Sequence, residues 1–207
     1  SSFIGREREI TEVRQLIETS RLVTLTGAGG SGKTRLALQA ARASLEPFPG
    51  GVWLVELAPL SDPALVPSLV TATLGMIEDK DRPVVDALVG YLRNRGILLL
   101  LDNCEHLIEA AAQLAETLLA HCPKLHILVT SREVLGIAGE VVWLAPTLAL
   151  PLRGEQPSAE DLGQYDAVRL FVERASAALP SFVLTEHNAA AVVQCCRQLD
   201  GIPLAIE

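Results

Sequence analysis

The sequence has little of what marks membrane-spanning, secreted or disulfide-linked proteins. No run of apolar residues is long enough to cross a bilayer, and the first residues lack the apolar centre of a secretory signal. The chain has four cysteines, and their spacing fits neither a zinc site nor a disulfide framework, so we assign no chemistry to Cys104, Cys122, Cys195 or Cys196. These absences predict a cytoplasmic protein with no membrane partner.

Basic residues are also in short supply. The chain has 17 Lys and Arg against 25 Asp and Glu, a formal net charge of -8. Nucleic-acid binding depends on clustered basic side chains, so we expect no direct nucleic-acid contact by this segment. The composition is otherwise that of a globular protein, and 207 residues suffice for one main domain with a small appendage.

Five short runs rich in leucine and β-branched residues have the character of buried parallel strands, and helix-length segments flank each of them. This alternation predicts an α/β fold, a parallel five-stranded sheet sandwiched by helices. The runs are 22–26 (LVTLT), 52–57 (VWLVEL), 97–102 (ILLLLD), 126–131 (HILVTS) and 141–146 (VVWLAP).

The pattern changes after this α/β part, which we place at residues 1–150. Prolines, glycines and polar residues predict a loop at about 147–164. Residues 165–207 contain two helical stretches and no strand signal, so we expect a small helical appendage there. The last residues, GIPLAIE, predict the first turn of a further helix entered at Pro203, which suggests a truncated helical domain.

The stretch GAGGSGKT lies between the first expected strand and a helix, and it fits the pattern G-x-x-x-x-G-K-[ST]. Glycines let backbone N–H groups turn around phosphate oxygens, and the following helix directs its positive end at the same anion. We expect Lys33 to reach the terminal phosphates and Thr34 to ligate Mg²⁺. The alternative is a glycine-rich turn that binds nothing. The expected contacts are Gly27, Ala28, Gly29, Gly30, Ser31, Gly32, Lys33, Thr34 and Arg35.

The third expected strand ends in Asp102, at the sheet edge where α/β folds bind ligands. We expect Asp102 to hold Mg²⁺ opposite Thr34, although Asp102 or Asn103 could instead cap the next helix. An amide at Asn103 cannot accept a proton from an attacking water. Glu105 could take that role, or it could be a structural residue of the helix start.

Arg132 follows the fourth expected strand at the same rim. An arginine there can sense a γ-phosphate through hydrogen bonds that a diphosphate cannot make. The alternative is a surface arginine in a salt bridge with a nearby glutamate.

The succession FIGRERE, GAGGSGKT, LLLLDNCE, LVTSRE, AVRLFVERA and DGIPLAIE resembles the signal-transduction ATPases with numerous domains, the STAND class of P-loop NTPases. Within that class it is similar to the NB-ARC-like modules of LuxR/AfsR-like bacterial transcriptional regulators. The resemblance covers nearly the whole chain, and GREREI and GIPLA are its most specific parts.

The resemblance implies an ASCE-type sheet with the fourth strand inserted between the first and third. It also implies that Ile4 and Arg6 flank the adenine, and that Pro203 contacts the nucleotide. Such modules are switches in which ATP or ADP, with Mg²⁺, controls domain closure and homo-oligomerisation alongside other domains of the chain. Slow ATP hydrolysis is expected, because Asn103 replaces a second acid found in many relatives.

Two other functions compete with the switch. A working AAA+-type ATPase in a ring would need an unambiguous catalytic acid and an arginine offered to a neighbour. A small-molecule kinase would need an arginine-rich lid, and the 147–164 loop has one arginine, Arg153. The preference for adenine over guanine rests on the resemblance.

Overall fold

The protein is described by a computed structural model that covers residues 3–77, 81–152, 154–155 and 157–207. The chain forms two compact units. The sheet unit contains Arg8–Gly27 and Lys33–Leu144. The helical unit contains residues 3–7, Ala28–Gly32 and Ala145–Glu207. Both units are built from separate pieces of the chain.

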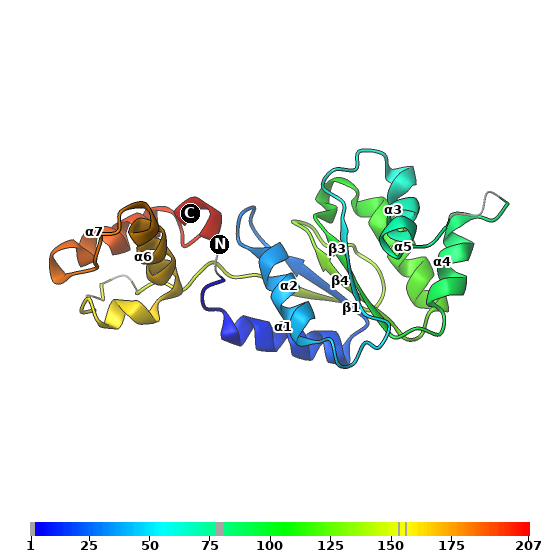
Figure 1. Ribbon diagram of the computed structural model, residues 1–207, viewed down its shortest axis with the longest axis horizontal. Coiled ribbons are helices and arrows are strands. Elements are labelled where there is room, and N and C mark those ends of the chain that lie inside the picture. The colour runs from blue at the N-terminus through cyan, green and yellow to red at the C-terminus, as the bar shows by residue number, and fades with distance from the viewer. Residues whose placement is uncertain (1–2, 78–80, 153, 156) are drawn as a thin grey trace. The chain divides into compact units, whose positions relative to one another are not determined.

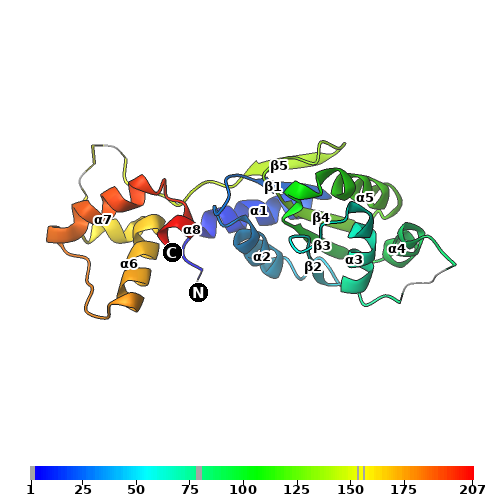
Figure 2. The same ribbon diagram turned by 90° about the horizontal axis from the view of Figure 1, so that it is seen from above.

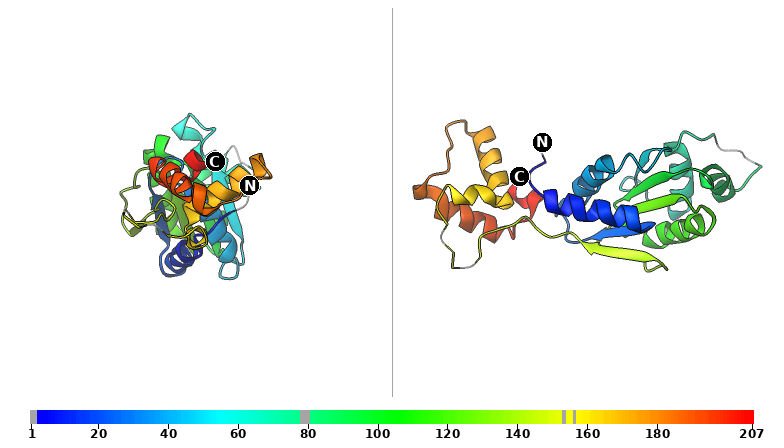
Figure 3. Two further views of the ribbon diagram at one scale, coloured as in Figure 1. Left: turned by 90° about the vertical axis from the view of Figure 1, so that its left-hand side faces the viewer. Right: turned by 90° about the horizontal axis from the view of Figure 1, so that it is seen from below.

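The sheet unit is built on five parallel strands. They are β1 (Leu22–Thr26), β2 (Val52–Glu56), β3 (Ile97–Asp102), β4 (Leu125–Thr130) and β5 (Glu140–Leu144). Their order is β2-β3-β4-β1-β5. The fourth strand therefore lies between the first and the third, as the resemblance implied. Strand β5 is an edge strand, the yellow-green arrow below the rest of the sheet unit in the right-hand view of Figure 3.

Helices cover both faces of this sheet (Figures 1 and 2). Helices α1 (Glu7–Thr19) and α2 (Lys33–Ala43) lie on one face, and α3 (Val66–Thr73), α4 (Val84–Leu92) and α5 (Ile108–His121) lie on the other. Two 3₁₀ turns, η1 (Pro63–Leu65) and η2 (Cys104–His106), precede α3 and α5. This arrangement confirms the predicted α/β fold.

The leucine run of β3 explains why the sheet has two covered faces. All six residues of β3 are buried. Because side chains alternate along a strand, Ile97, Leu99 and Leu101 pack with α3, α4 and α5, in one large apolar cluster. Leu98 and Leu100 are also fully buried. A strand that is apolar at every position needs cover on both sides.

The helical unit has an apolar core of its own. It contains the 3₁₀ turn η3 (Asp161–Gln164) and helices α6 (Asp166–Ala178), α7 (Glu186–Gln198) and α8 (Pro203–Ile206). Helix α7 begins with a reciprocal capping box between Thr185 and Asn188. Pro203 is at the first position of α8, as expected for a helix-starting proline.

The expected strands agree with the observed ones to within two residues at each end. The largest difference is that β5 ends at Leu144 instead of residue 146, and β4 ends one residue early, at Thr130 instead of residue 131. Ser131 and Arg132 therefore follow β4 as irregular chain. Among the described helices, none combines the length and the apolar character needed to cross a bilayer.

Candidate functional site

The carboxyl ends of β1, β3 and β4 gather the polar residues that the sequence singled out. The chain leaves β1 at Thr26, passes through the glycine-rich loop and enters α2 at Lys33. Gly30 has a φ of 76° and Gly32 a φ of 84°, both in the left-handed region that side chains disfavour. The glycines thus permit a tight turn between strand and helix, as the loop pattern predicts.

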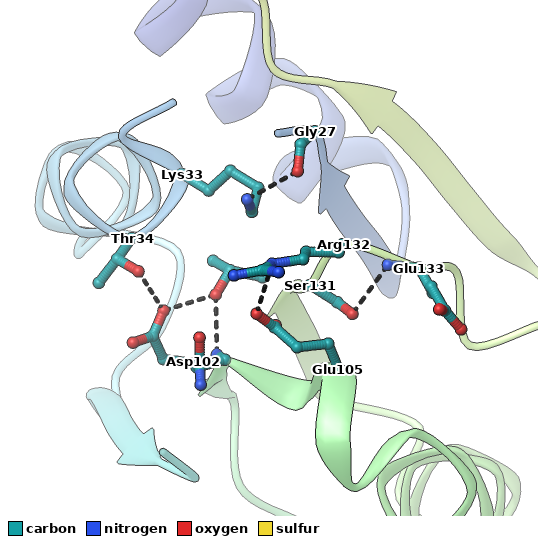
Figure 4. Close-up of polar contacts among 10 residues, drawn as sticks. Gly27, Lys33, Thr34, Asp102, Glu105, Ser131, Arg132 and Glu133 are labelled. Atoms are coloured by element: carbon teal, nitrogen blue, oxygen red, sulfur yellow. Dashed lines mark hydrogen bonds and ion pairs between the residues drawn. The ribbon is translucent and has the colours of Figure 1, made fainter. Parts of the chain in front are cut away.

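Lys33 folds back over the base of this loop. Its Nζ donates a hydrogen bond of 2.9 Å to the carbonyl oxygen of Gly27 (Figure 4). Burial lowers the pKa of Lys33 from its ordinary value, and this effect exceeds the opposing attraction of Glu105. The ammonium group is therefore held beside the carbonyl of Gly27, where Glu105 and Asp102 attract it electrostatically.

Asp102 and Thr34 meet across the sheet end. The Thr34 hydroxyl donates to Oδ1 of Asp102 over 2.6 Å (Figure 4). Asp102 is 7% exposed and is the last residue of β3. The structure thus brings together the two residues expected to hold Mg²⁺.

Asn103 has a strained backbone. Its φ of 63° and ψ of 54° place it in the left-handed region, which asparagine tolerates better than most residues. It makes no side-chain capping hydrogen bond to the 3₁₀ turn, and α5 begins later, at Ile108. The helix-cap alternative therefore does not describe Asn103 in this structure.

Glu105 and Arg132 form an ion pair. Arg132 Nε lies 3.2 Å from Glu105 Oε1, with the arginine side chain 64% exposed and the glutamate 21% exposed (Figure 4). The second oxygen, Oε2 of Glu105, is buried and has no hydrogen-bond partner among the described residues. The salt bridge that was the alternative for Arg132 is present, and its partner is the candidate catalytic acid.

The candidates that come from the resemblance, Ile4, Arg6 and Pro203, lie in the helical unit. Arg6 is 3% exposed, and its Nη2 donates over 2.9 Å to the carbonyl of Pro146. Its backbone N–H donates over 3.2 Å to Asp166. A Cβ built on Gly32 would lie 3.5 Å from Arg6 Nη1 and 3.7 Å from Pro203 Cγ. Arg6, Gly32 and Pro203 are therefore neighbours within this unit.

Ile4 lies in an apolar environment. It packs against the core of the helical unit and lines a cavity of about 310 Å³. The other apolar walls of the cavity are Val168, Val172 and Leu184. Of the remaining loop candidates, Ala28 and Gly29 are exposed and Arg35 is half-buried.

Sequence reasoning missed Thr130. This threonine ends β4, is 1% exposed and donates a hydrogen bond of 2.5 Å to Asp102 Oδ1. Threonine is a common strand residue, so the run LVTS gives no sign of a second role. Only the alignment of β3 beside β4 could have revealed it.

The side chains present fit a magnesium–nucleotide ligand. Thr34 and Asp102 offer hydroxyl and carboxylate oxygens, the ligand type that Mg²⁺ prefers. No group of three or more His, Cys, Asp or Glu able to hold a metal occurs in the described part of the chain, so phosphate and water oxygens would complete the coordination. In the loop, the Ser31 hydroxyl is buried and lacks a hydrogen-bond partner among the residues described. A buried polar atom of this kind is suited to a polar ligand.

Comparison with known proteins finds regulators among the relatives. No family model matches the chain. A "Putative HTH-type transcriptional regulator" of Mycobacterium tuberculosis is 44% identical over 195 residues, covering 94% of this chain and 20% of that protein. The "Regulatory protein AfsR" of Streptomyces griseus is 30% identical over 196 residues, covering 86% of this chain and 20% of that protein. The chain thus spans about a fifth of the length of these relatives.

Comparison with solved structures finds ATPases. A STAND protein with a tetratricopeptide repeat sensor from Pyrococcus horikoshii aligns with a TM-score of 0.55 and 17% identity, over 99% of this chain and 29% of that one. The Aeropyrum pernix ORC2 protein aligns with a TM-score of 0.59 and 16% identity, over 94% of this chain and 70% of that one. The predicted P-loop ATPase fold is confirmed.

Proposed function

We propose that this chain is the nucleotide-binding switch module of a bacterial transcriptional regulator of the STAND class, NB-ARC-like in type. Its ligands are ATP or ADP with Mg²⁺, and its location is the cytoplasm. The observation that carries the proposal is the contact between Thr34 and Asp102 beside the glycine loop. A hydroxyl from the loop helix and a carboxylate from the next strand but one are the two protein ligands that a phosphate-bound Mg²⁺ needs.

The candidate site residues have separate roles in this function. Lys33 neutralises the terminal phosphates, and the loop amides surround them. Thr34 and Asp102 hold the metal, which when bound neutralises charge on the β- and γ-phosphates. Arg132 exchanges its ion pair with Glu105 for a γ-phosphate. Glu105, once released, accepts a proton from the attacking water.

Slow hydrolysis is part of the proposal. Asn103 has no carboxylate to act as a base, and Glu105 is held by Arg132 over 3.2 Å. A base that is tied to the sensor arginine is active only after the arginine moves. Such an arrangement suits a switch that stays in one nucleotide state for a long time.

The helical unit supplies the conformational response. Pro203 and Arg6 lie near Gly32 of the loop within that unit, and Ile4 lines an apolar cavity. We assign binding of the purine to the surroundings of Ile4 and Arg6. We assign to Pro203 a contact with the nucleotide that depends on the diphosphate being bound. Differential contacts to ADP and ATP would then control domain closure and assembly with further copies.

The test is a binding and turnover measurement on the purified chain. Calorimetry should detect ADP and ATP in the presence of Mg²⁺. Lys33→Ala should weaken binding at least tenfold, because it removes a charge-assisted contact worth about 1.5–3 kcal/mol. Asp102→Ala should abolish the dependence of binding on Mg²⁺. Glu105→Gln should keep binding and lower turnover by a factor of at least about 100.

Lys124→Ala is the matched control, since Lys124 is an exposed lysine just before β4, at the amino-terminal end of that strand. It should bind nucleotide as the unaltered chain does. Absence of binding by folded, unaltered protein would refute the proposal. Turnover in the range of about 1–1000 per second would instead favour a working AAA+-type ATPase.

A further inference from the structure

Thr130 is a buried polar side chain that contacts the candidate metal ligand Asp102. It ends β4 and is 1% exposed. Its Oγ1 donates over 2.5 Å to Oδ1 of Asp102, and it accepts a hydrogen bond of 3.0 Å from the backbone N–H of Asn103. A hydroxyl has one proton and two lone pairs, so both bonds are made at once by a single group.

The bond to Asp102 fixes the carboxylate. Thr34 and Thr130 both donate to the same oxygen, Oδ1, from the loop helix and from β4. Two donors from different elements leave the carboxylate little rotational freedom about its last bond. Oδ2 is the oxygen that these two hydroxyls do not engage, and its direction is set by them.

The bond to Asn103 fixes the backbone that follows. Asn103 has a φ of 63°, a conformation that costs free energy and persists only where the surroundings hold it. The Thr130 hydroxyl satisfies the N–H of this strained residue. The 3₁₀ turn η2 starts immediately afterwards and carries Glu105. The position of Glu105 therefore depends on the same hydroxyl as the position of Asp102.

We propose that Thr130 is a positioning residue that sets both the metal-holding carboxylate of Asp102 and the turn that presents Glu105. The proposal rests on the function proposed above, since it concerns the same magnesium–nucleotide site. Thr130 contacts neither nucleotide nor metal. It acts by holding Asp102 and Asn103 in place.

The test replaces the hydroxyl while keeping the shape. Thr130→Val removes the donor and acceptor, Thr130→Ser keeps them, and Thr130→Ala is a second deletion if the valine variant fails to fold. Thr24→Val is the matched control. Thr24 is also fully buried, in the adjacent strand β1, but its hydroxyl has no hydrogen-bond partner among the described residues.

The readout is the Mg²⁺ concentration needed for half-maximal tightening of a fluorescent ADP analogue. We expect Thr130→Val to raise it by about 10–100-fold, the usual effect of losing a residue that orients a metal ligand. Binding in EDTA should stay unchanged. Thr130→Ser should restore the Mg²⁺ requirement to within about threefold, and Thr24→Val should match the unaltered chain.

A second readout needs no ligand. Hydrogen exchange at the Asn103 amide should be faster in Thr130→Val and Thr130→Ala than in Thr24→Val. An unchanged Mg²⁺ requirement in Thr130→Val would overturn the inference, and so would an equal rise of the Mg²⁺ requirement in the serine and valine variants. In either case, nucleotide binding by the unaltered chain would leave the proposed function intact. If the unaltered chain binds no nucleotide, both proposals fail together.

Discussion

At the scale of single residues, the ion pair between Arg132 and Glu105 joins the candidate phosphate sensor to the candidate catalytic acid, two residues that the sequence did not connect. The pattern allowed Arg132 to be a phosphate sensor or a surface salt-bridge residue. The structure places it 3.2 Å from Glu105, the residue we assign to water activation. Ion pairs with an exposed partner contribute little stability, so we expect Arg132 to exchange this one for a phosphate. Both roles then belong to different states of one side chain.

A substitution at Arg132 tests this exchange. We expect Arg132→Gln to reduce the preference for a non-hydrolysable ATP analogue over ADP by about tenfold, the equivalent of one charge-assisted hydrogen bond. Calorimetric dissociation constants for the two nucleotides would measure it. Arg8→Gln is the control, because Arg8 forms a similar exposed pair with Glu12, 2.9 Å apart, in α1. Equal preferences in both variants would remove the sensor role from Arg132.

Some residues could be predicted from the chain alone, and others could not. Lys33, Thr34 and Asp102 are at positions fixed by a loop pattern and by the end of an apolar strand, so their expected chemistry follows from their residue types. Thr130 depends on the register of β4 against β3, which no local pattern contains. Asp166, whose carboxylate accepts the Arg6 N–H, is separated from Arg6 by 160 positions. Partners so distant in sequence become visible only in the fold.

At the scale of elements, the glycine loop is constrained by α8 as well as by phosphate chemistry. The N–H of Leu204 donates over 3.2 Å to the carbonyl of Gly30. A Cβ on Gly30 would lie 2.9 Å from the Cβ of Leu204, a distance that forces one of them to move. The sequence predicted the need for glycine from ligand binding, whereas the structure adds a second reason from packing within the helical unit.

Gly30→Ala should therefore disturb the contact between the loop and α8. We expect faster hydrogen exchange at the Leu204 amide, by about five- to thirty-fold if 1–2 kcal/mol of local stability is lost. Gly75→Ala is the control, since Gly75 has a φ of 68° but nothing within 4 Å of the position of a new Cβ. Gly75→Ala should have the same cost of a side chain in the left-handed region, but its Cβ should collide with no other atom. If both variants leave Leu204 unchanged, the contact does not constrain the loop.

The secondary structure itself was largely predictable because the strands are unusually apolar. A run such as ILLLLD can only be an interior strand or a buried helix, and its length decides for the strand. Local conformations were less accessible. The backbone N–H of the left-handed Asn103 donates a hydrogen bond to Thr130 of β4, a contact that no local pattern contains. The position of Asn103 next to Asp102 shows that the least predictable backbone lies where the chemistry is expected.

At the scale of the whole molecule, two apolar cores divide the chain. Leu100 belongs to β3 and Leu162 to the helical unit, and both are fully buried. We expect Leu162→Ala to cost the helical unit about 2–5 kcal/mol and to leave the sheet unit protected from hydrogen exchange. Leu100→Ala should remove protection in the sheet unit. Mass spectrometry of exchanged peptides would separate the two. Loss of protection in both units from Leu162→Ala would mean that they unfold as one.

The chain covers about a fifth of the length of the regulators it resembles, and this fraction bears on the switch. Domain closure and assembly stay proposals for this chain. The proposed nucleotide binding, its proposed dependence on Mg²⁺ and the proposed roles of Lys33, Asp102 and Thr130 concern residues of this chain. They can be measured on the chain as it stands.

The central place of β4 in the sheet has one more consequence. Neighbouring strands are about 4.8 Å apart, so β1 and β3 are separated by roughly 10 Å, with the end of β4 in the gap. We expect a molecule that contacts both Gly27 and Asp102 to lie across the end of β4, where the chain continues into the exposed Arg132. One residue added to β4 would shift the chain that follows this strand by about 3.3 Å, more than the length of a hydrogen bond. The number of residues in this strand is therefore as restricted as their identity.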